Sequence, residues 1–187
     1  SAGLVLTSRI PDAAPNERGS AWERVFSGIR IFGATPRLRG VLALDLAVAG
    51  CGSIVMVTTV NYVRDVLGRG QTDVAWLLAA SGTGTMIVAL ALPPILDRIA
   101  DRTVMLVGGS LLVVGAGGAV ELSTGTGDHR WVAALGIWLV IGAGMSSVLT
   151  PIGRVLRRSA AIADRPAVFA AQFSLSHLCW LVTYPIA

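Results

Sequence analysis

The fold is decided by residues 74–120, which read VAWLLAASGTGTMIVALALPPILDRIADRTVMLVGGSLLVVGAGGAV. This stretch begins with 23 residues, Val74–Leu96, that include no Asp, Glu, Lys or Arg, and it ends with a second uncharged run, Thr103–Val120. About 20 consecutive apolar residues are enough to cross the hydrocarbon core of a bilayer as a helix. We therefore predict two membrane-crossing helices joined by a short, highly charged connection, DRIADR, at residues 97–102.

The same signature recurs on both sides of this pair. Two further runs, Trp131–Gly153 and Pro166–Ala187, carry no charged residue, and Gly40–Tyr62 is interrupted only by Asp45. Charged residues make up 14% of the 187-residue chain, whereas a soluble domain carries about a quarter. A soluble helical bundle would also need amphipathic stripes, which these runs lack. The sequence predicts an all-α integral membrane protein with about five transmembrane helices.

The arginines indicate which connections share a side of the membrane. All 15 basic residues are arginines, and 12 of them fall in the alternate connections 1–39, 97–102 and 154–165. Arginine accumulates on the cytoplasmic side of membrane proteins. We therefore predict cytoplasmic loops at 9–39, 97–102 and 154–165 of a multi-pass protein in the cell (plasma) membrane. Because the basic charge follows this rule, it does not indicate a nucleic-acid partner.

Both ends of the chain suggest a piece of a larger membrane protein. Residues 1–8, SAGLVLTS, have the composition of the end of a preceding transmembrane helix, and the last apolar run stops without a closing charge. Residues 9–39 form a polar connection in which Ser20 and Glu23 make a capping box. This pattern predicts either an interfacial helix on the cytoplasmic leaflet or a disordered linker, before a five-helix domain at 40–187. The apolar residues that recur at helical spacing are Trp22, Val25, Phe26 and Ile29.

The charged connection carries a family resemblance. Transporters of the major facilitator superfamily have the pattern Gly-x-x-x-Asp-Arg-x-Gly-Arg-Arg/Lys between the second and third helix of each half. Here Asp97, Arg98 and Arg102 are kept, while both glycines and the first base of the closing pair are replaced. The six matching positions are Pro93, Asp97, Arg98, Ala100, Asp101 and Arg102. Together with YVRDVLGRG after the first span and RPAVFAAQFSLSHLCWLVTYP near the end, they make the chain resemble the C-terminal half of a bacterial efflux-type member, helices seven to eleven.

This resemblance implies a partial major facilitator fold and a function. It implies a secondary active transporter of small solutes that works by alternating access, with proton-coupled efflux as the expected form. The implied partners are a small-molecule substrate, protons, the lipid bilayer and the missing N-terminal half, without a cofactor. No Ser–His–Asp spacing or pair of carboxylates supports catalysis, so we expect no enzyme. Two alternatives stay open: a non-transporting membrane scaffold and an inactive half-transporter fragment.

The cluster at residues 97–102 admits two interpretations. Asp97, Arg98 and Arg102 can pair with one another and with neighbouring helix ends, forming a contact that holds in one conformation and breaks in another. Such a contact would gate transport. The plainer interpretation is that Arg98 and Arg102 only enforce topology by staying on the cytoplasmic side.

Asp45 is a candidate for substrate binding or proton coupling. An ionisable group at membrane depth costs about 2.5–3.5 kcal/mol on insertion scales, so it is retained where it has a role. Asp45 either carries a proton or a cationic substrate, or it is a structural partner for an arginine such as Arg39 or Arg158.

His177 and Gln172 are further candidates near the middle of the last span. With Ser176, Trp180 and Tyr184, they make a polar and aromatic face at helical spacing. His177 either relays protons or is hydrogen-bonded between packed helices. Cys179 is turned about 200° from His177 around the helix, so no metal site is predicted here.

Overall fold

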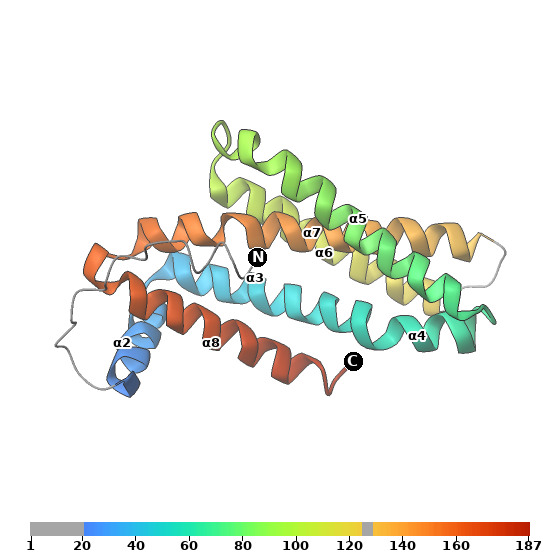
Figure 1. The fold of residues 1–187 in the computed structure, drawn as a ribbon, viewed down its shortest axis with the longest axis horizontal. Helices are drawn as coiled ribbons and strands as arrows, with labels where there is room; N and C mark the ends of the chain where they lie inside the picture. The colour runs from blue at the N-terminus through green and yellow to red at the C-terminus, as the bar shows by residue number, and fades with distance from the viewer. Residues whose placement is uncertain (1–20, 125–128) are drawn as a thin grey trace, which may run out of the picture.

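The computed structural model describes residues 21–124 and 129–187. These residues contain helices and no strand, and five of the helical segments in this described part are long and apolar enough to cross a membrane. In Figure 1 the long helices run side by side along one axis, while a short helix crosses them at one end. The predicted all-α membrane fold with five transmembrane helices is therefore confirmed.

The helices follow the uncharged runs but extend beyond them. The first span, Pro36–Val66, combines α3 (Pro36–Ser53) and α4 (Thr59–Asn61) with two π-helical turns, Ile54–Thr58 and Tyr62–Val66. The hydroxyls of Thr58 and Thr59 donate to the carbonyls of Ile54 and Val55, a local bond that bends helices. The remaining helices are α2 (Ala21–Ala34), α5 (Gln71–Leu96), α6 (Asp101–Thr124), α7 (Arg130–Ser159) and α8 (Arg165–Thr183), with a 3₁₀ turn at Ile162–Asp164.

The length of α7 changes one sequence prediction. The segment 154–165 was expected to be a connection, yet α7 continues as a helix to Ser159, so Arg154, Arg157 and Arg158 lie on its last turns. Arginine favours the helical state, and positive charge near a helix C-terminus is stabilised by the helix dipole. The arginines are therefore held on a rigid element.

Helix α7 packs against both α5 and α6 through glycines. A Cβ atom on Gly142 would overlap the carbonyl oxygen of Ser81, and one on Gly84 would overlap the carbonyl oxygen of Leu139. Thr85 of α5 also donates its hydroxyl to the Gly142 carbonyl at 3.1 Å. Small residues allow such close approach of backbones inside a membrane. The α5–α7 crossing therefore depends on these glycines.

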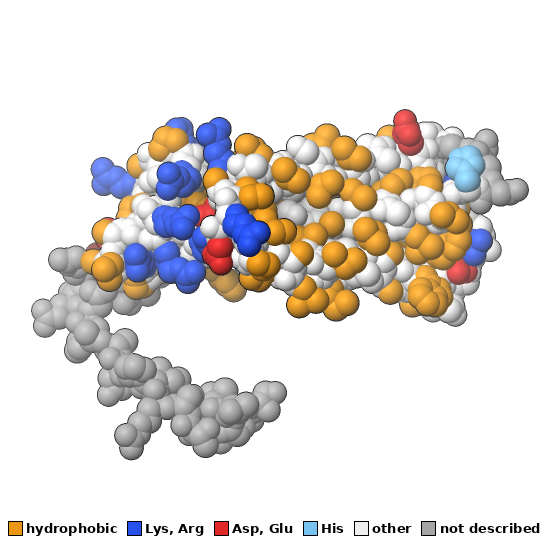
Figure 2. Space-filling model, turned by 90° about the horizontal axis from the view of Figure 1, so that it is seen from above, with side chains coloured by type: hydrophobic (Ala, Val, Ile, Leu, Met, Phe, Trp, Pro, Cys, Tyr) orange, Lys and Arg blue, Asp and Glu red, His pale blue; other side chains and the backbone are white. Residues whose placement is uncertain are grey.

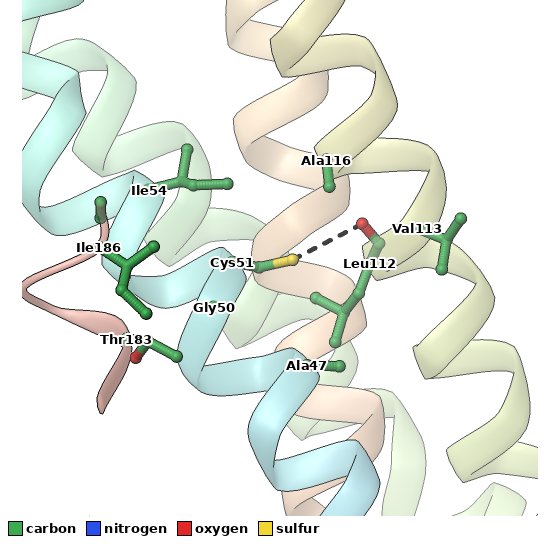
Figure 3. A pocket seen from close by; sticks show the side chains of 10 residues that line it. Ala47, Gly50, Cys51, Ile54, Leu112, Val113, Ala116, Thr183 and Ile186 are labelled. Carbon is green, nitrogen blue, oxygen red and sulfur yellow. Dashed lines mark hydrogen bonds between the residues drawn. The ribbon is translucent and has the colours of Figure 1, made fainter. Parts of the chain in front are cut away.

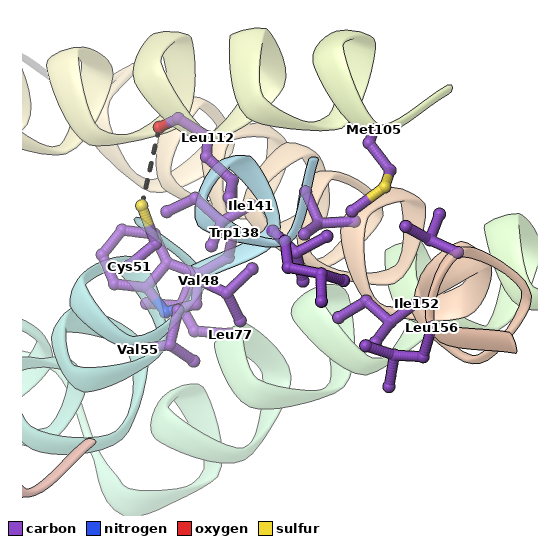
Figure 4. Close-up of a cluster of buried hydrophobic side chains, with 14 of the residues drawn as sticks. Val48, Cys51, Val55, Leu77, Met105, Leu112, Trp138, Ile141, Ile152 and Leu156 are labelled. Carbon is purple, nitrogen blue, oxygen red and sulfur yellow. Dashed lines mark hydrogen bonds between the residues drawn. The ribbon is translucent and has the colours of Figure 1, made fainter. Parts of the chain in front are cut away.

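The buried core lies where α3, α5, α6 and α7 meet. Figure 4 shows Leu112 and Ile141 packed beside Trp138 and Val48. The Trp138 indole N–H donates to the Thr59 hydroxyl at 2.9 Å, so this polar group has a partner inside the core. Unpaired polar groups are costly in hydrocarbon, and this hydrogen bond also joins α7 to the first span.

Helix α2 lies across the start of α8. Gly28 faces the carbonyl of Ala167 so closely that a Cβ atom would overlap it, and the Phe32 side chain is fully buried. Phe26 is exposed, as a residue facing lipid would be. The predicted helix in this region is present from Ala21, whereas residues 1–8 and Ser20 of the predicted capping box lie outside the described residues.

Candidate functional site

The charged residues of the α5–α6 connection meet arginines at the end of α7. The Arg158 Nη1 lies 2.7 Å from the Asp101 Oδ2, and the Arg154 Nε lies 3.3 Å from the Asp101 Oδ1. Arg154 also approaches Asp97 at 3.5 Å and donates to the Leu96 carbonyl at 3.0 Å. We call Asp97, Asp101, Arg154 and Arg158 the junction cluster.

Asp101 is the central residue of this junction cluster. Its side chain is only 8% exposed, whereas the side chains of Asp97 and Arg158 are 78% and 60% exposed. The Arg158 contact is a charge-assisted hydrogen bond to this buried carboxylate, and such bonds are stronger than those between exposed groups. The Arg154 contact is an ion pair, and the Asp101 Oδ1 accepts no hydrogen bond from the described residues. The Asp101 contacts therefore contribute most to joining α7 to the α5–α6 connection.

The ion pairs differ from those predicted from the sequence. The predicted gating residues are Asp97, Arg98 and Arg102, but Arg98 and Arg102 are exposed and form no ion pair with any described residue. Asp101 was noted in the motif and was not selected as a site residue. One signal was available: Asp97 and Asp101 are four residues apart, as are Arg154 and Arg158, so each pair can share one side of its segment.

Asp45 and Gln172 face each other across α3 and α8. Asp45 is 3% exposed, and the Gln172 Nε2 donates to its Oδ2 at 2.6 Å. The Gln172 Oε1 is buried and has no hydrogen-bond partner among the described residues. No described arginine forms an ion pair with Asp45, so the suggested pairing with Arg39 or Arg158 is absent from this structure. The structure thus brings two of the predicted candidates together.

His177, the third candidate, has no hydrogen bond or ring contact with Asp45 or Gln172 among the described contacts. Its Nδ1 lies 2.7 Å from the Phe173 carbonyl oxygen, and its ring centroid is 4.0 Å from that of Phe173. Both contacts lie within α8, and the His177 side chain is exposed. The contacts of His177 therefore do not join it to α3.

A cavity of about 270 Å³ opens between the first span, α5, α7 and α8. Gly52 of α3 lies against the Trp180 ring, which a Cβ atom at position 52 would overlap. Gly52 follows Asp45 by seven residues, about 10 Å along a helix, so the same two helices carry the acid and the cavity wall. The lining residues are Gly52, Val55, Met56, Leu78, Ser81, Gly82, Thr85, Met145 and Trp180.

A second hollow, of about 470 Å³, lies between α3, α6 and the end of α8. Figure 3 shows Ala47, Gly50 and Ala116 on its walls, with the Cys51 thiol directed to the Leu112 carbonyl. Its surface is almost wholly apolar. It therefore suits an apolar molecule and offers little with which to orient a polar solute.

The surface charge is concentrated at one end of the helical bundle. In Figure 2 the arginines gather at that end, while the middle of the visible face is mostly apolar. An uncharged band between polar ends is the surface expected of a membrane-embedded protein. The junction cluster lies at the arginine-rich end, because it joins the C-terminus of α7 to the α5–α6 connection.

Comparisons with known proteins agree with this architecture. The family model for MFS/sugar transport proteins matches residues 4–152. The "Triacylglyceride transporter" of Mycolicibacterium smegmatis is 32% identical over 168 residues, which cover 81% of this chain and 29% of the relative. The chain thus spans less than a third of the length of that relative. No solved structure matches this chain. With its membrane-crossing helices and a family match over most of its length, the chain belongs to the major facilitator superfamily of transporters.

Proposed function

We propose that this chain forms part of the second half of a secondary transporter that exports small solutes by alternating access, driven by protons. The observation that carries the proposal is the buried Asp45–Gln172 pair, which joins α3 and α8, two of the four membrane-crossing segments that bound the cavity. Family membership supports transport in general. Substrate binding near the midplane, between two halves that rock against each other, is the mechanism this architecture suits.

Asp45 is the proposed proton-coupling residue. A carboxylate paired with a neutral amide can take up a proton without leaving a buried arginine unpaired. The Gln172 amide offers both an N–H donor and a carbonyl acceptor. Ionised Asp45 accepts from the Gln172 Nε2, and protonated Asp45 can donate to the Oε1, which has no partner among the described residues. Both protonation states therefore retain a hydrogen bond after a rotation of the amide.

The cavity lining favours an apolar cargo. Met56, Met145 and Leu78 contribute flexible or branched apolar surface, and Trp180 contributes an aromatic wall. Methionine adapts its shape to irregular ligands, and binding pockets for apolar molecules are lined in this way. The M. smegmatis relative is named as a transporter of triacylglyceride. A lipid-like molecule is therefore the first cargo to test.

The junction cluster is the proposed gate at the arginine-rich end, which we place in the cytoplasm. We expect Asp101→Asn to change the transport rate about tenfold. This corresponds to a change of ~1.4 kcal/mol in the free-energy difference between the open and closed states. The asparagine loses both charge-assisted contacts to Arg154 and Arg158. Initial rates of transport in proteoliposomes measure this effect.

Two further variants separate gating from topology. Exchanging the partners, in Asp101→Arg with Arg158→Asp and Arg154→Gln, is expected to restore part of the rate; Arg154 is replaced because an arginine at position 101 would otherwise face it. Arg157→Ala is the matched control, because Arg157 is the exposed neighbour of Arg158 on α7 and forms no ion pair with the described residues. Equal rates for Asp101→Asn and Arg157→Ala would leave topology as the role of the cluster.

Blocking the cavity tests the transport proposal. Gly82 lines the cavity, and a Cβ atom at this position would meet nothing within 4 Å. Gly82→Trp should fill the cavity without disturbing the helices, and we expect transport to fall about tenfold or more. The probes are a fluorescent triacylglyceride analogue and tetraphenylphosphonium, each measured with the intact protein in proteoliposomes.

Gly136→Trp is the matched control for this experiment. Gly136 is exposed on α7, has open space at its Cβ position and does not line the cavity. A well-folded Gly82→Trp protein that transports either probe at the wild-type rate would show that the solute does not pass this cavity. No transport of either probe by the wild-type protein would favour the membrane-scaffold alternative.

A further inference from the structure

Arg98 and Arg102 are left without acidic partners at the α5–α6 connection. Arg154 and Arg158 of α7 occupy both carboxylates of this connection, Asp97 and Asp101. Four arginines therefore share two aspartates, and the excess positive charge resides on the two exposed residues, Arg98 and Arg102. Within the described parts of the chain, no carboxylate pairs with either.

The two arginines lie in a position where a lipid headgroup would be adjacent. Ile95 and Ile99 are 38% and 45% exposed on the same connection, and Leu106 is 54% exposed one turn into α6. Exposed apolar side chains beside arginines mark the boundary between the hydrocarbon and headgroup layers, where arginine extends its guanidinium toward the polar side. In Figure 2 the arginine-rich end directly adjoins the apolar band.

The chemistry of the pair fits a phosphate group. Each guanidinium presents a planar set of N–H donors that matches two phosphate oxygens. Arg98 lies in the turn that follows α5, and Arg102 lies four residues on, in the first turn of α6, so both exposed side chains extend from the same short connection. The adjacent apolar residues would contact the acyl chains, which a free anion lacks.

We propose that Arg98 and Arg102 bind the phosphate of an anionic phospholipid in the adjacent leaflet. This role is separate from the gate, because neither arginine takes part in the ion pairs of the junction cluster. It also gives a role to Arg98 and Arg102, the two arginines of the motif that form no ion pair with Asp97 or Asp101. The ligand class is a glycerophospholipid with net negative charge, with phosphatidylglycerol as the probe.

Native mass spectrometry of the intact protein tests this site. The protein is titrated with phosphatidylglycerol and, separately, with phosphatidylcholine of the same acyl chains. We expect the wild type to bind phosphatidylglycerol more tightly, and Arg98→Gln with Arg102→Gln to weaken that binding on the order of tenfold. Binding of phosphatidylcholine should be unchanged, and Arg98→Lys with Arg102→Lys should retain part of the preference.

The controls distinguish a specific lipid site at Arg98 and Arg102 from general attraction of anionic lipid to a basic surface. Arg37→Gln with Arg39→Gln removes two exposed arginines near the start of α3 and is expected to have a smaller effect. Equal losses in the two double variants would overturn the proposal in favour of a generally basic surface. Displacement of phosphatidylglycerol by an equal concentration of inorganic phosphate would show a free-anion site instead. Thermal unfolding of each variant in detergent verifies that both remain folded, as expected for exposed side chains.

Discussion

Gly142→Leu is expected to prevent helices α5 and α7 from packing correctly. Gly142 lies against the backbone of Ser81 and Gly84 lies against that of Leu139, so the two glycines make reciprocal contacts across the α5–α7 crossing. A leucine side chain cannot fit between backbones at this distance and would force the helices apart. Overpacking typically costs 1–3 kcal/mol and here acts on backbone rather than on a movable side chain, so we expect about 3 kcal/mol or more.

Separating these helices would have a second consequence. The Thr85 hydroxyl donates to the Gly142 carbonyl across the crossing, and this bond would break as the helices part. Helix α7 also packs against α6, where Gly108 and Gly144 approach closely. The damage would therefore spread to the whole α5–α6–α7 unit that positions the cavity and the junction cluster.

Size-exclusion chromatography after detergent extraction measures this effect together with the unfolding temperature. The matched control is Gly136→Leu, on the same helix but with open space at its Cβ position. We expect Gly136→Leu to elute as the wild type does and Gly142→Leu to aggregate. Identical behaviour of the two variants would contradict the described α5–α7 crossing.

Asp45→Asn is expected to remove proton coupling while leaving the fold intact. Asparagine has nearly the same shape and can still hydrogen-bond to Gln172, but it does not bind and release a proton. We expect gradient-driven transport to fall about tenfold or more. Solute exchange at equal pH, which needs no net proton movement, should persist.

A second variant separates the coupling candidates. His177→Gln is expected to retain gradient-driven transport, since the polar contact of His177 lies within its own helix. Loss of coupling in His177→Gln with normal coupling in Asp45→Asn would transfer the role to His177. Initial rates with and without an imposed pH gradient measure both variants.

The number and order of the membrane-crossing helices could be predicted from the sequence. The uncharged runs are long, and the hydrocarbon core demands such length, so each run alone indicates its span. The end of α7 could not be predicted this way, because Arg154 and Arg158 are polar yet belong to the helix and point to partners 57 residues earlier in the chain. A charge pattern indicates that these arginines need acidic partners. Which carboxylates they pair with is determined by the packing of α7 on α5 and α6.

The candidate site was predictable in part. Membrane depth singled out Asp45 and helical spacing singled out Gln172, but nothing in either local pattern joins residues 127 positions apart. The cavity could not be predicted from the sequence, because Met56, Leu78 and Met145 are indistinguishable in sequence from residues that face lipid. The π-helical turn at Ile54–Thr58 was also missed, because Thr58 and Thr59 have no distinctive sequence pattern and only their hydroxyl bonds to the backbone mark the turn.

The most direct test of proton-driven transport is proton movement caused by the solute. The intact protein is reconstituted in vesicles that contain a pH-sensitive dye, and a gradient of the transported probe is imposed without a pH gradient. The wild type is predicted to move protons opposite to the solute, and Asp45→Asn to move solute without protons. Solute transport without any proton movement in the wild type would contradict the proposal.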